Sequence, residues 1–220
     1  MGDAAVLVTL TKTIDLIANR KIHALTQKME VNLLAGISEI VPAYGSILVH
    51  YDPMIVDFTT LSSWIRLYCK DTADMNLQSG RTIKIPVRYG HEDGPDLNDV
   101  ARYCQVSPAE VIRIHTRNIY QVFMMGFTPG FPYLGGMDLS IATPRLDTPR
   151  KLVPAGSVGI AGTQTGIYSV DSPGGWRIIG RTPVELFNLQ ADLPFLLRPG
   201  DLVQFFPISE DGGQDESEDR

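Results

Sequence analysis

Apolar positions in the first part of the chain follow two periods, which predict alternating strands and helices. The segment VLVTL (6–10) is short and rich in β-branched residues, as is typical of a strand. After it, Ile22, Leu25 and Met29 are three and four residues apart, which puts them on one face of a helix. Leu61 and its neighbours up to Tyr68 indicate a second amphipathic helix by the same spacing.

Three further strands complete this part of the pattern. The runs ISEIV (37–41) and SILVHY (46–51) flank proline, tyrosine and glycine, so they predict a tight hairpin. Apolar residues alternate in TIKIPVRY (82–89), which predicts a last strand. The order βαββαβ is that of a ferredoxin-like domain, in which both helices cover one face of a four-stranded antiparallel sheet. We therefore expect a ferredoxin-like domain over residues 1–88.

Residues 89–117 are expected to form a helical connector. The segment YGHEDGPD consists of turn-forming residues, and two short helices are indicated after it. The second helix has the clearest start in the sequence, because Ser107 as N-cap, Pro108 and Glu110 form a capping box. We expect this helix to end near His115.

The composition changes in the second part of the chain. Between Gly126 and Gly200 lie 12 of the 20 glycines and 9 of the 15 prolines, separated by short β-rich segments such as SVGIAG and WRIIG, and a further such segment, LVQFF, follows at 202–206. This pattern excludes long helices and favours a closed or nearly closed β-barrel, and closure would remove the edge strands that promote aggregation. The predicted fold class is thus α+β, with a β-barrel domain over residues 118–208 and an acidic tail, 209–220, after it.

The charge of the chain is concentrated in that tail. SEDGGQDESEDR holds six acids and one arginine, so the rest of the chain carries only about −1 of the net charge of −6. A nearly neutral body argues against nucleic-acid binding, which needs a basic surface. The tail is expected to be disordered. No apolar run approaches the roughly 18 residues of a membrane span, and no secretory signal is recognisable, so we expect a cytoplasmic protein without membrane contact.

Several common site motifs are not supported. GSVGIAGT lacks the lysine and the spacing of a phosphate-binding P-loop. Ser157 in AGSVG lies in a context that only superficially matches a nucleophile elbow, because Pro154 precedes it and a β-like segment follows. Cys69 and Cys104 lie on apolar helical patterns, which favours structural burial over a disulfide. No metal site is expected, because none of the histidines has metal-ligand spacing: His23, His50, His91 and His115.

Three arginines in the second part stand beside prolines or glycines that fix the backbone, namely Arg145, Arg150 and Arg181. A guanidinium held in this way suits a carboxylate or a phosphate. Ordinary surface pairing with Asp147 and Glu185 explains them equally well.

Aromatic residues are displayed from proline–glycine turns in MMGFTPGFPYLGGMD (124–138). Phe127, Phe131, Tyr133 and the later Trp176 fit either a plug in the barrel or a binding surface, and the residues alone leave both open.

Three long motifs, GFTPGFPYLGG (126–136), TPRLDTPRKLVPAGSVGIAGTQTGIYSVDSPGGW (143–176) and IIGRTP (178–183), resemble one family. This is the 5-oxoprolinase B-subunit family, also called the kinase-inhibitor KipI or allophanate hydrolase subunit 1 family. The resemblance extends from the N-terminus to about residue 208. At Ser169-Val170 the sequence departs from the tyrosine-proline usual in the family.

The resemblance implies a cyclophilin-like barrel and a protein that is inactive alone. Such a protein works with a partner of related barrel fold, the C subunit, and with an A subunit to open 5-oxoproline, a lactam, to glutamate, with ATP as co-substrate. Some members are described instead as inhibitors of a sporulation histidine kinase, which is the main alternative. Peptidyl-prolyl isomerase activity is a weaker option, because fold alone does not confer function.

On this resemblance we expect a cleft shared with the C subunit. His115 is a candidate for moving a proton, although a role as helix C-cap is the simpler explanation, and Arg181 is the second catalytic candidate. The expected substrate-binding residues are Tyr133, Arg145, Arg150, Gln164 and Tyr168. The expected partner interface consists of Phe127, Pro129, Phe131, Leu134, Pro173, Gly174, Gly175 and Trp176.

Overall fold

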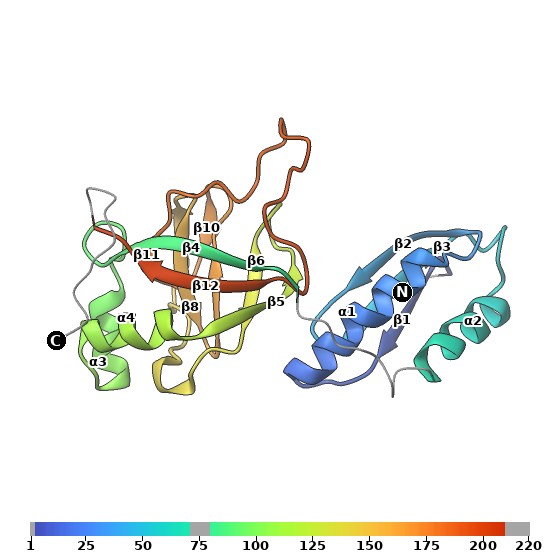
Figure 1. Ribbon diagram of the computed structural model, residues 1–220, viewed down its shortest axis with the longest axis horizontal. Coiled ribbons are helices and arrows are strands. Elements are labelled where there is room, and N and C mark those ends of the chain that lie inside the picture. The colour runs from blue at the N-terminus through green and yellow to red at the C-terminus, as the bar shows by residue number, and fades with distance from the viewer. Residues whose placement is uncertain (1–2, 71–79, 210–220) are drawn as a thin grey trace. The chain divides into compact units, whose positions relative to one another are not determined.

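The computed structural model describes residues 3–70 and 80–209 of the chain (Figure 1). The chain divides into two compact units between Ser79 and Gly80. No helix in the described ranges is long and apolar enough to cross a membrane. The predicted acidic tail lies, apart from Ser209, outside the described residues.

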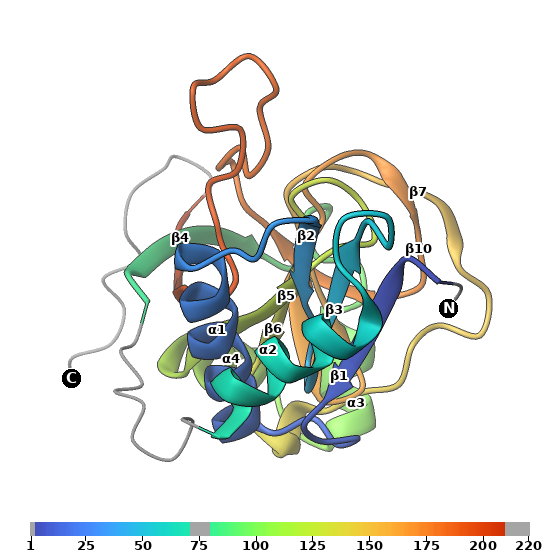
Figure 2. The same cartoon turned by 90° about the vertical axis from the view of Figure 1, so that its right-hand side faces the viewer.

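The N-terminal unit is a three-stranded antiparallel sheet with two helices on one face (Figure 2). Its strands have the order β1-β3-β2, so β2 and β3 form the predicted hairpin. The predicted apolar faces of both helices are buried in one core, which includes Ile22, Leu25 and Leu61. The elements are β1 (Ala5–Thr9), α1 (Leu16–Val31), β2 (Ile37–Pro42), β3 (Ser46–Tyr51) and α2 (Phe58–Lys70).

The strand expected to complete a ferredoxin-like sheet belongs to the barrel instead. β4 (Thr82–Tyr89) pairs in parallel with β12 (Leu202–Pro207) and antiparallel with β11 (Arg177–Arg181) (Figure 1). Ile85 and Val87 are fully buried in the barrel core. The alternation of apolar residues identified a strand correctly but carried no information about its partners, so the prediction of a fourth strand in the N-terminal sheet was wrong.

The C-terminal unit contains a closed seven-stranded barrel, which fits the predicted cyclophilin-like architecture. Around the barrel the strand order is β11-β4-β12-β5-β6-β9-β8, and β8 pairs with β11 to close it. β7 and β10 form a separate two-stranded ribbon. The remaining elements are α3 (Leu97–Cys104), α4 (Pro108–Arg117), β5 (Ile119–Met125), β6 (Pro132–Gly135), the 3-10 helix η2 (Leu139–Ile141), β7 (Arg150–Val153), β8 (Ser157–Ala161), β9 (Gln164–Ile167) and β10 (Ser172–Gly174).

Both short helices pack against the barrel, so they are part of this unit rather than a connector. Val100 of α3 and Ile114 of α4 belong to the same apolar core as Phe205 of β12. The start of α4 is as predicted, because the Ser107 side chain accepts a hydrogen bond from the backbone N–H of Glu110.

Candidate functional site

An aromatic cluster lies beside β6, β9 and β10 in the barrel unit. The ring of Phe131 meets the rings of Tyr168 and Trp176 edge to face, with centroids 5.2 and 5.4 Å apart. These three rings are almost completely buried, whereas Tyr133, 5.0 Å from Phe131, is half-buried. The sequence left two explanations open, a plug in the barrel and a binding surface. The burial of these three rings supports the first, a plug of packed side chains.

Phe127 is the ring that this cluster presents to solvent. Its side chain is 59% exposed, and its edge lies against Phe131 and Tyr168. Its backbone φ is +68°, and the N–H of Thr128 donates to the carbonyl oxygen of Gly126 across it, which closes a γ-turn. A left-handed conformation costs a bulky residue roughly 1–2 kcal/mol. Strain of this kind is concentrated at functional sites, which makes Phe127 a candidate contact residue.

Ser169, where the sequence departs from its family, holds the loop that carries Phe127. The hydroxyl of Ser169 donates to the carbonyl oxygen of Pro129 at 2.5 Å. The serine side chain at this position thus supports the GFTPG turn (126–130).

Arg145 is the cation associated with this cluster. Its guanidinium carbon lies 6.0 Å from the centroid of the Trp176 ring, a cation–π contact. Burial raises the pKa of Tyr133 and Tyr168, and the positive charge of Arg145 partly opposes this. Within residues 3–70 and 80–209 no ion pair engages Arg145, so the alternative explanation by pairing with Asp147 is not observed. Its guanidinium is therefore available to an anionic ligand.

The other two predicted arginines make structural contacts. Arg150 forms an ion pair of 2.7 Å with Asp96, which is almost fully buried and also accepts the backbone N–H of Ile178 at 2.7 Å. This carboxylate joins the start of α3 to β7 and β11. Arg181 donates from Nε to the carbonyl oxygen of Ala155 at 2.9 Å. The alternative pairing with Glu185 is not observed for either of them in the described chain.

The remaining predicted residues are only partly on the surface. Gln164 is half-buried at the start of β9, and Leu134 is fully buried in the main barrel core. Gly174 faces Tyr168 so closely that an added Cβ would lie 2.1 Å from the hydroxyl. The predicted interface residues Phe131, Leu134 and Trp176 are buried within the chain, so the expectation that they form an exposed surface was wrong. The interface residues that do have exposed positions are Phe127, Pro129 and Pro173, with Gly174 and Gly175 half-buried.

His115 is fully buried in the barrel core, with both ring nitrogens engaged. Nδ1 lies 2.8 Å from the hydroxyl of Tyr89, and Nε2 lies 3.0 Å from that of Thr165. Because the Thr165 hydroxyl donates to the carbonyl oxygen of Gly159, it accepts from the N–H at Nε2, and Tyr89 then donates to Nδ1. The ring also stacks on Phe205, at a centroid distance of 4.5 Å.

These contacts give His115 a structural role. Burial lowers the pKa of the imidazole from 6.5 to about 3, so the ring is neutral. The predicted C-cap role was wrong, because α4 continues to Arg117 and its C-cap is Asn118. The ring has no access to solvent or to a ligand, which argues against the predicted proton transfer.

Sequence reasoning missed the partners that complete these networks. Tyr89, Asp96 and Thr165 were not singled out, although all three have side chains held by hydrogen bonds in the barrel unit. Only Asp96 carried a local signal, as an acid directly before a predicted helix.

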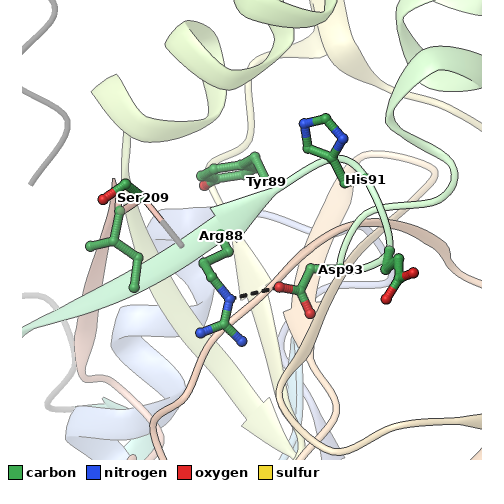
Figure 3. Close-up of a pocket in the computed structure, with 8 residues that line it drawn as sticks. Arg88, Tyr89, His91, Asp93 and Ser209 are labelled. Atoms are coloured by element: carbon green, nitrogen blue, oxygen red, sulfur yellow. Dashed lines mark hydrogen bonds and ion pairs between the residues drawn. The ribbon is translucent and has the colours of Figure 1, made fainter. Parts of the chain in front are cut away.

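A pocket of about 470 Å³ lies at the end of β4 and is lined by residues 88–93, 208 and 209 (Figure 3). Arg88 points toward Asp93 and forms an ion pair of 2.7 Å with it, so these charges neutralise each other. The described residues contain no group of three or more side chains suited to a metal ion. The arginine of this pocket is thus paired, whereas Arg145 makes no ion pair among the described residues.

The buried neutral His115 predicts a specific pH dependence. Between pH 6.5 and about 3 the unfolded chain binds a proton at His115 that the folded chain does not. The free energy of unfolding should therefore fall as pH is lowered through this range, by up to about 1.4 kcal/mol per pH unit from this group. In urea titrations at a series of pH values, the stability difference between wild type and His115→Gln, which cannot titrate, should narrow toward low pH. A difference that is constant between pH 6.5 and 4 would contradict the assignment.

The comparisons with known proteins agree on one family. The family described as "Carboxyltransferase domain, subdomain C and D" matches residues 1–197. The chain is 43% identical to the B subunit of 5-oxoprolinase from Bacillus subtilis, over 96% of this chain and 92% of that protein. It is 41% identical to the B subunit of 5-oxoprolinase from Haemophilus influenzae, over 93% of this chain and 94% of that protein.

Solved structures share the fold. The protein TTHA0988 is 34% identical with a TM-score of 0.83, and the match covers 95% of this chain but 41% of that one. PH0987 from Pyrococcus horikoshii is 46% identical with a TM-score of 0.59, over 96% of this chain and 97% of that one. This chain thus spans less than half the length of TTHA0988 and nearly all of PH0987. It belongs to the carboxyltransferase subdomain C and D family and, within it, to the family of proteins named as the B subunit of 5-oxoprolinase.

Proposed function

We propose that this chain is the B subunit of an ATP-dependent 5-oxoprolinase, which opens 5-oxoproline to glutamate together with the A and C subunits and is inactive without them. The identity of 39–43% to proteins named as the B subunit of 5-oxoprolinase, over nearly the whole chain, supports this assignment. None of the relatives named above is described as a kinase inhibitor, so no observation favours that alternative. The structural observation that carries the proposal is Arg145, which makes no ion pair among the described residues and lies over Trp176. Trp176 belongs to the same aromatic cluster that presents the strained Phe127 to solvent.

The reaction explains why such a site needs no nucleophilic side chain. The lactam oxygen attacks the γ-phosphorus of ATP and ADP leaves, which converts the amide oxygen into a phosphate leaving group. Water then adds to the ring carbon, the carbon–nitrogen bond breaks with protonation of nitrogen, and γ-glutamyl phosphate results. A second water molecule releases phosphate and glutamate. These steps require positioning and positive charge more than covalent catalysis by the protein.

The described residues supply those two requirements in part. The Arg145 guanidinium would bind an anionic oxygen, either the carboxylate of 5-oxoproline or the transferred phosphoryl group. Phe127 and the half-buried Tyr133 would pack against the ring, and Gln164 would orient it. Arg145 carries this role better than Arg150 or Arg181, because those two already bind groups of the protein. ATP is expected as a co-substrate of the complex, and the remaining catalytic groups would come from the other subunits.

Co-expression tests the proposal directly. The chain should copurify with candidate A and C subunits from the same genome, and the complex should release glutamate from 5-oxoproline only when ATP is present. The chain alone should release none. A complex that assembles but gives no ATP-dependent glutamate would refute the proposed reaction.

Replacement of Arg145 tests its role within that complex. Arg145→Ala should lower kcat/KM for 5-oxoproline or ATP by about 10- to 100-fold, because a hydrogen bond to a charged group is worth about 1.5–3 kcal/mol. Assembly should be unaffected, since the side chain is exposed and makes no ion pair in the described chain. Arg102→Ala, which removes an arginine with a 78% exposed side chain from α3, is the matched control and should keep full activity. Full activity of the Arg145 variant would remove this residue from the site.

Replacement of Phe127 separates function from stability. Phe127→Gly should leave the free energy of unfolding within about 1 kcal/mol of wild type, because relief of the left-handed strain offsets the added freedom of the unfolded chain. Turnover by the assembled enzyme should nevertheless fall. Phe131→Ala, which empties a buried position, should instead cost about 3–5 kcal/mol in a urea titration. Unchanged turnover of the Phe127 variant would show that the exposed ring is not used.

A further inference from the structure

The side chain of Arg145 is exposed, but the backbone on both sides of it is fixed to the barrel unit. Arg145 lies in an irregular segment, residues 142–149, between η2 and β7. Near the start of this segment, Thr143 exchanges two backbone hydrogen bonds, of 3.2 and 2.8 Å, with the turn between β8 and β9. Directly after Arg145, the N–H of Leu146 donates to the carbonyl oxygen of Gly175 at 2.8 Å. These contacts join main chain to main chain and leave the guanidinium of Arg145 unused.

A third contact to this segment comes from a side chain. The Nε–H of Arg177 donates to the carbonyl oxygen of Pro144 at 3.0 Å. Arg177 is the first residue of β11 and is paired there with Ile160 of β8, so its own backbone belongs to the closed barrel. Because a side chain makes this contact, a substitution can remove it, whereas the backbone contacts cannot be removed in this way.

Together these contacts set Arg145 opposite Trp176. The residue before Arg145 accepts a hydrogen bond from the residue after Trp176, and the residue after Arg145 donates one to the residue before Trp176. The two residues between these contacts face each other, and their side chains make the cation–π contact of 6.0 Å. Loss of the hydrogen bond from Arg177 would leave Arg145 held on one side only.

The position of Arg145 matters for any ligand that it binds. A flexible side chain loses conformational entropy when a ligand fixes it, so a guanidinium that is already held in place binds more tightly. In an enzyme, a displacement of about 1 Å can lower turnover about 100-fold. A contact that fixes the backbone of Arg145 can therefore change the activity of the site without touching the substrate.

We propose that Arg177 is a positioning residue of the candidate site, which holds the Arg145 guanidinium beside Trp176 through its hydrogen bond to Pro144. For its effect on turnover this inference rests on the proposed function, whereas the positioning itself is a property of this chain. The role requires the Nε–H donor of Arg177 and does not require its positive charge.

Two substitutions separate the donor from the charge. Arg177→Met keeps an unbranched side chain but removes the donor, and should lower kcat/KM of the assembled complex for 5-oxoproline about 3- to 10-fold. Arg177→Gln has an amide N–H as many bonds from the backbone as Nε, so it keeps the donor and should stay within about twofold of wild type. Arg102→Met, on α3 with a 78% exposed side chain in wild type, is the matched control and should keep full activity.

A double variant tests whether Arg177 acts through Arg145. When Arg145 is already replaced by alanine, the further change Arg177→Met should have no effect on kcat/KM. A contact that only stabilises the fold would instead lower activity by the same factor in both backgrounds. Equal factors would overturn the inference, as would full activity of Arg177→Met or equal losses in Arg177→Met and Arg177→Gln.

Nuclear magnetic resonance of the full chain alone measures the positioning directly. Nuclear Overhauser effects between the Arg145 side chain and the Trp176 ring should be present in wild type and in Arg177→Gln, and lost in Arg177→Met. If Arg177→Met does not fold, the wild-type spectrum decides, because absence of these effects or rapid exchange of the Arg177 Nε–H overturns the inference. If the wild-type complex releases no glutamate with ATP, the proposed function fails, and this measurement still tests Arg177.

Discussion

The barrel unit depends on the parallel pairing of β4 with β12. These strands come from the two ends of the unit, and six registered residue pairs, from Leu202 with Thr82 to Pro207 with Val87, join them. With β11 on the other side of β4, this pairing closes the sheet and leaves the barrel without an open edge. It also fixes the ends of the segments between, and α3, α4 and the two ends of the loop over residues 186–197 are all anchored in the barrel core.

In the closed barrel, the polar and aromatic side chains considered for the site fall into two groups, buried and exposed. The buried side chains all have partners within the protein, as His115 has in its hydrogen bonds with Tyr89 and Thr165. The same holds for Asp96, whose charge is matched by Arg150. The exposed side chains are those of Arg145 and Phe127. Arg145 makes no ion pair in the described residues, and Phe127 has an unfavourable backbone conformation. Of these four residues only Arg145 and Phe127 are accessible to a ligand, so the candidate site is incomplete.

An incomplete site is consistent with a protein that works as one subunit. Under the proposed function, Arg145 and Phe127 would bind and orient an anionic ligand, while phosphoryl transfer and the activation of water would need groups from other chains. The relatives at 39–43% identity are named as one subunit of 5-oxoprolinase, which agrees with a site that is incomplete in this chain.

The sequence by itself determined the local elements and the family. Spacing of apolar residues located α1, α2 and the hairpin of β2 and β3, and Ser107 marked the start of α4, because these features depend on neighbours within one or two turns. Its density of glycine and proline indicated a barrel, and its long motifs identified the family. Only the tertiary structure decided the partners of β4, the partner of Arg150 and the burial of His115. Each of these depends on residues far away in the chain, such as Thr165, 50 positions after His115, and no local pattern carries information about contacts at that separation.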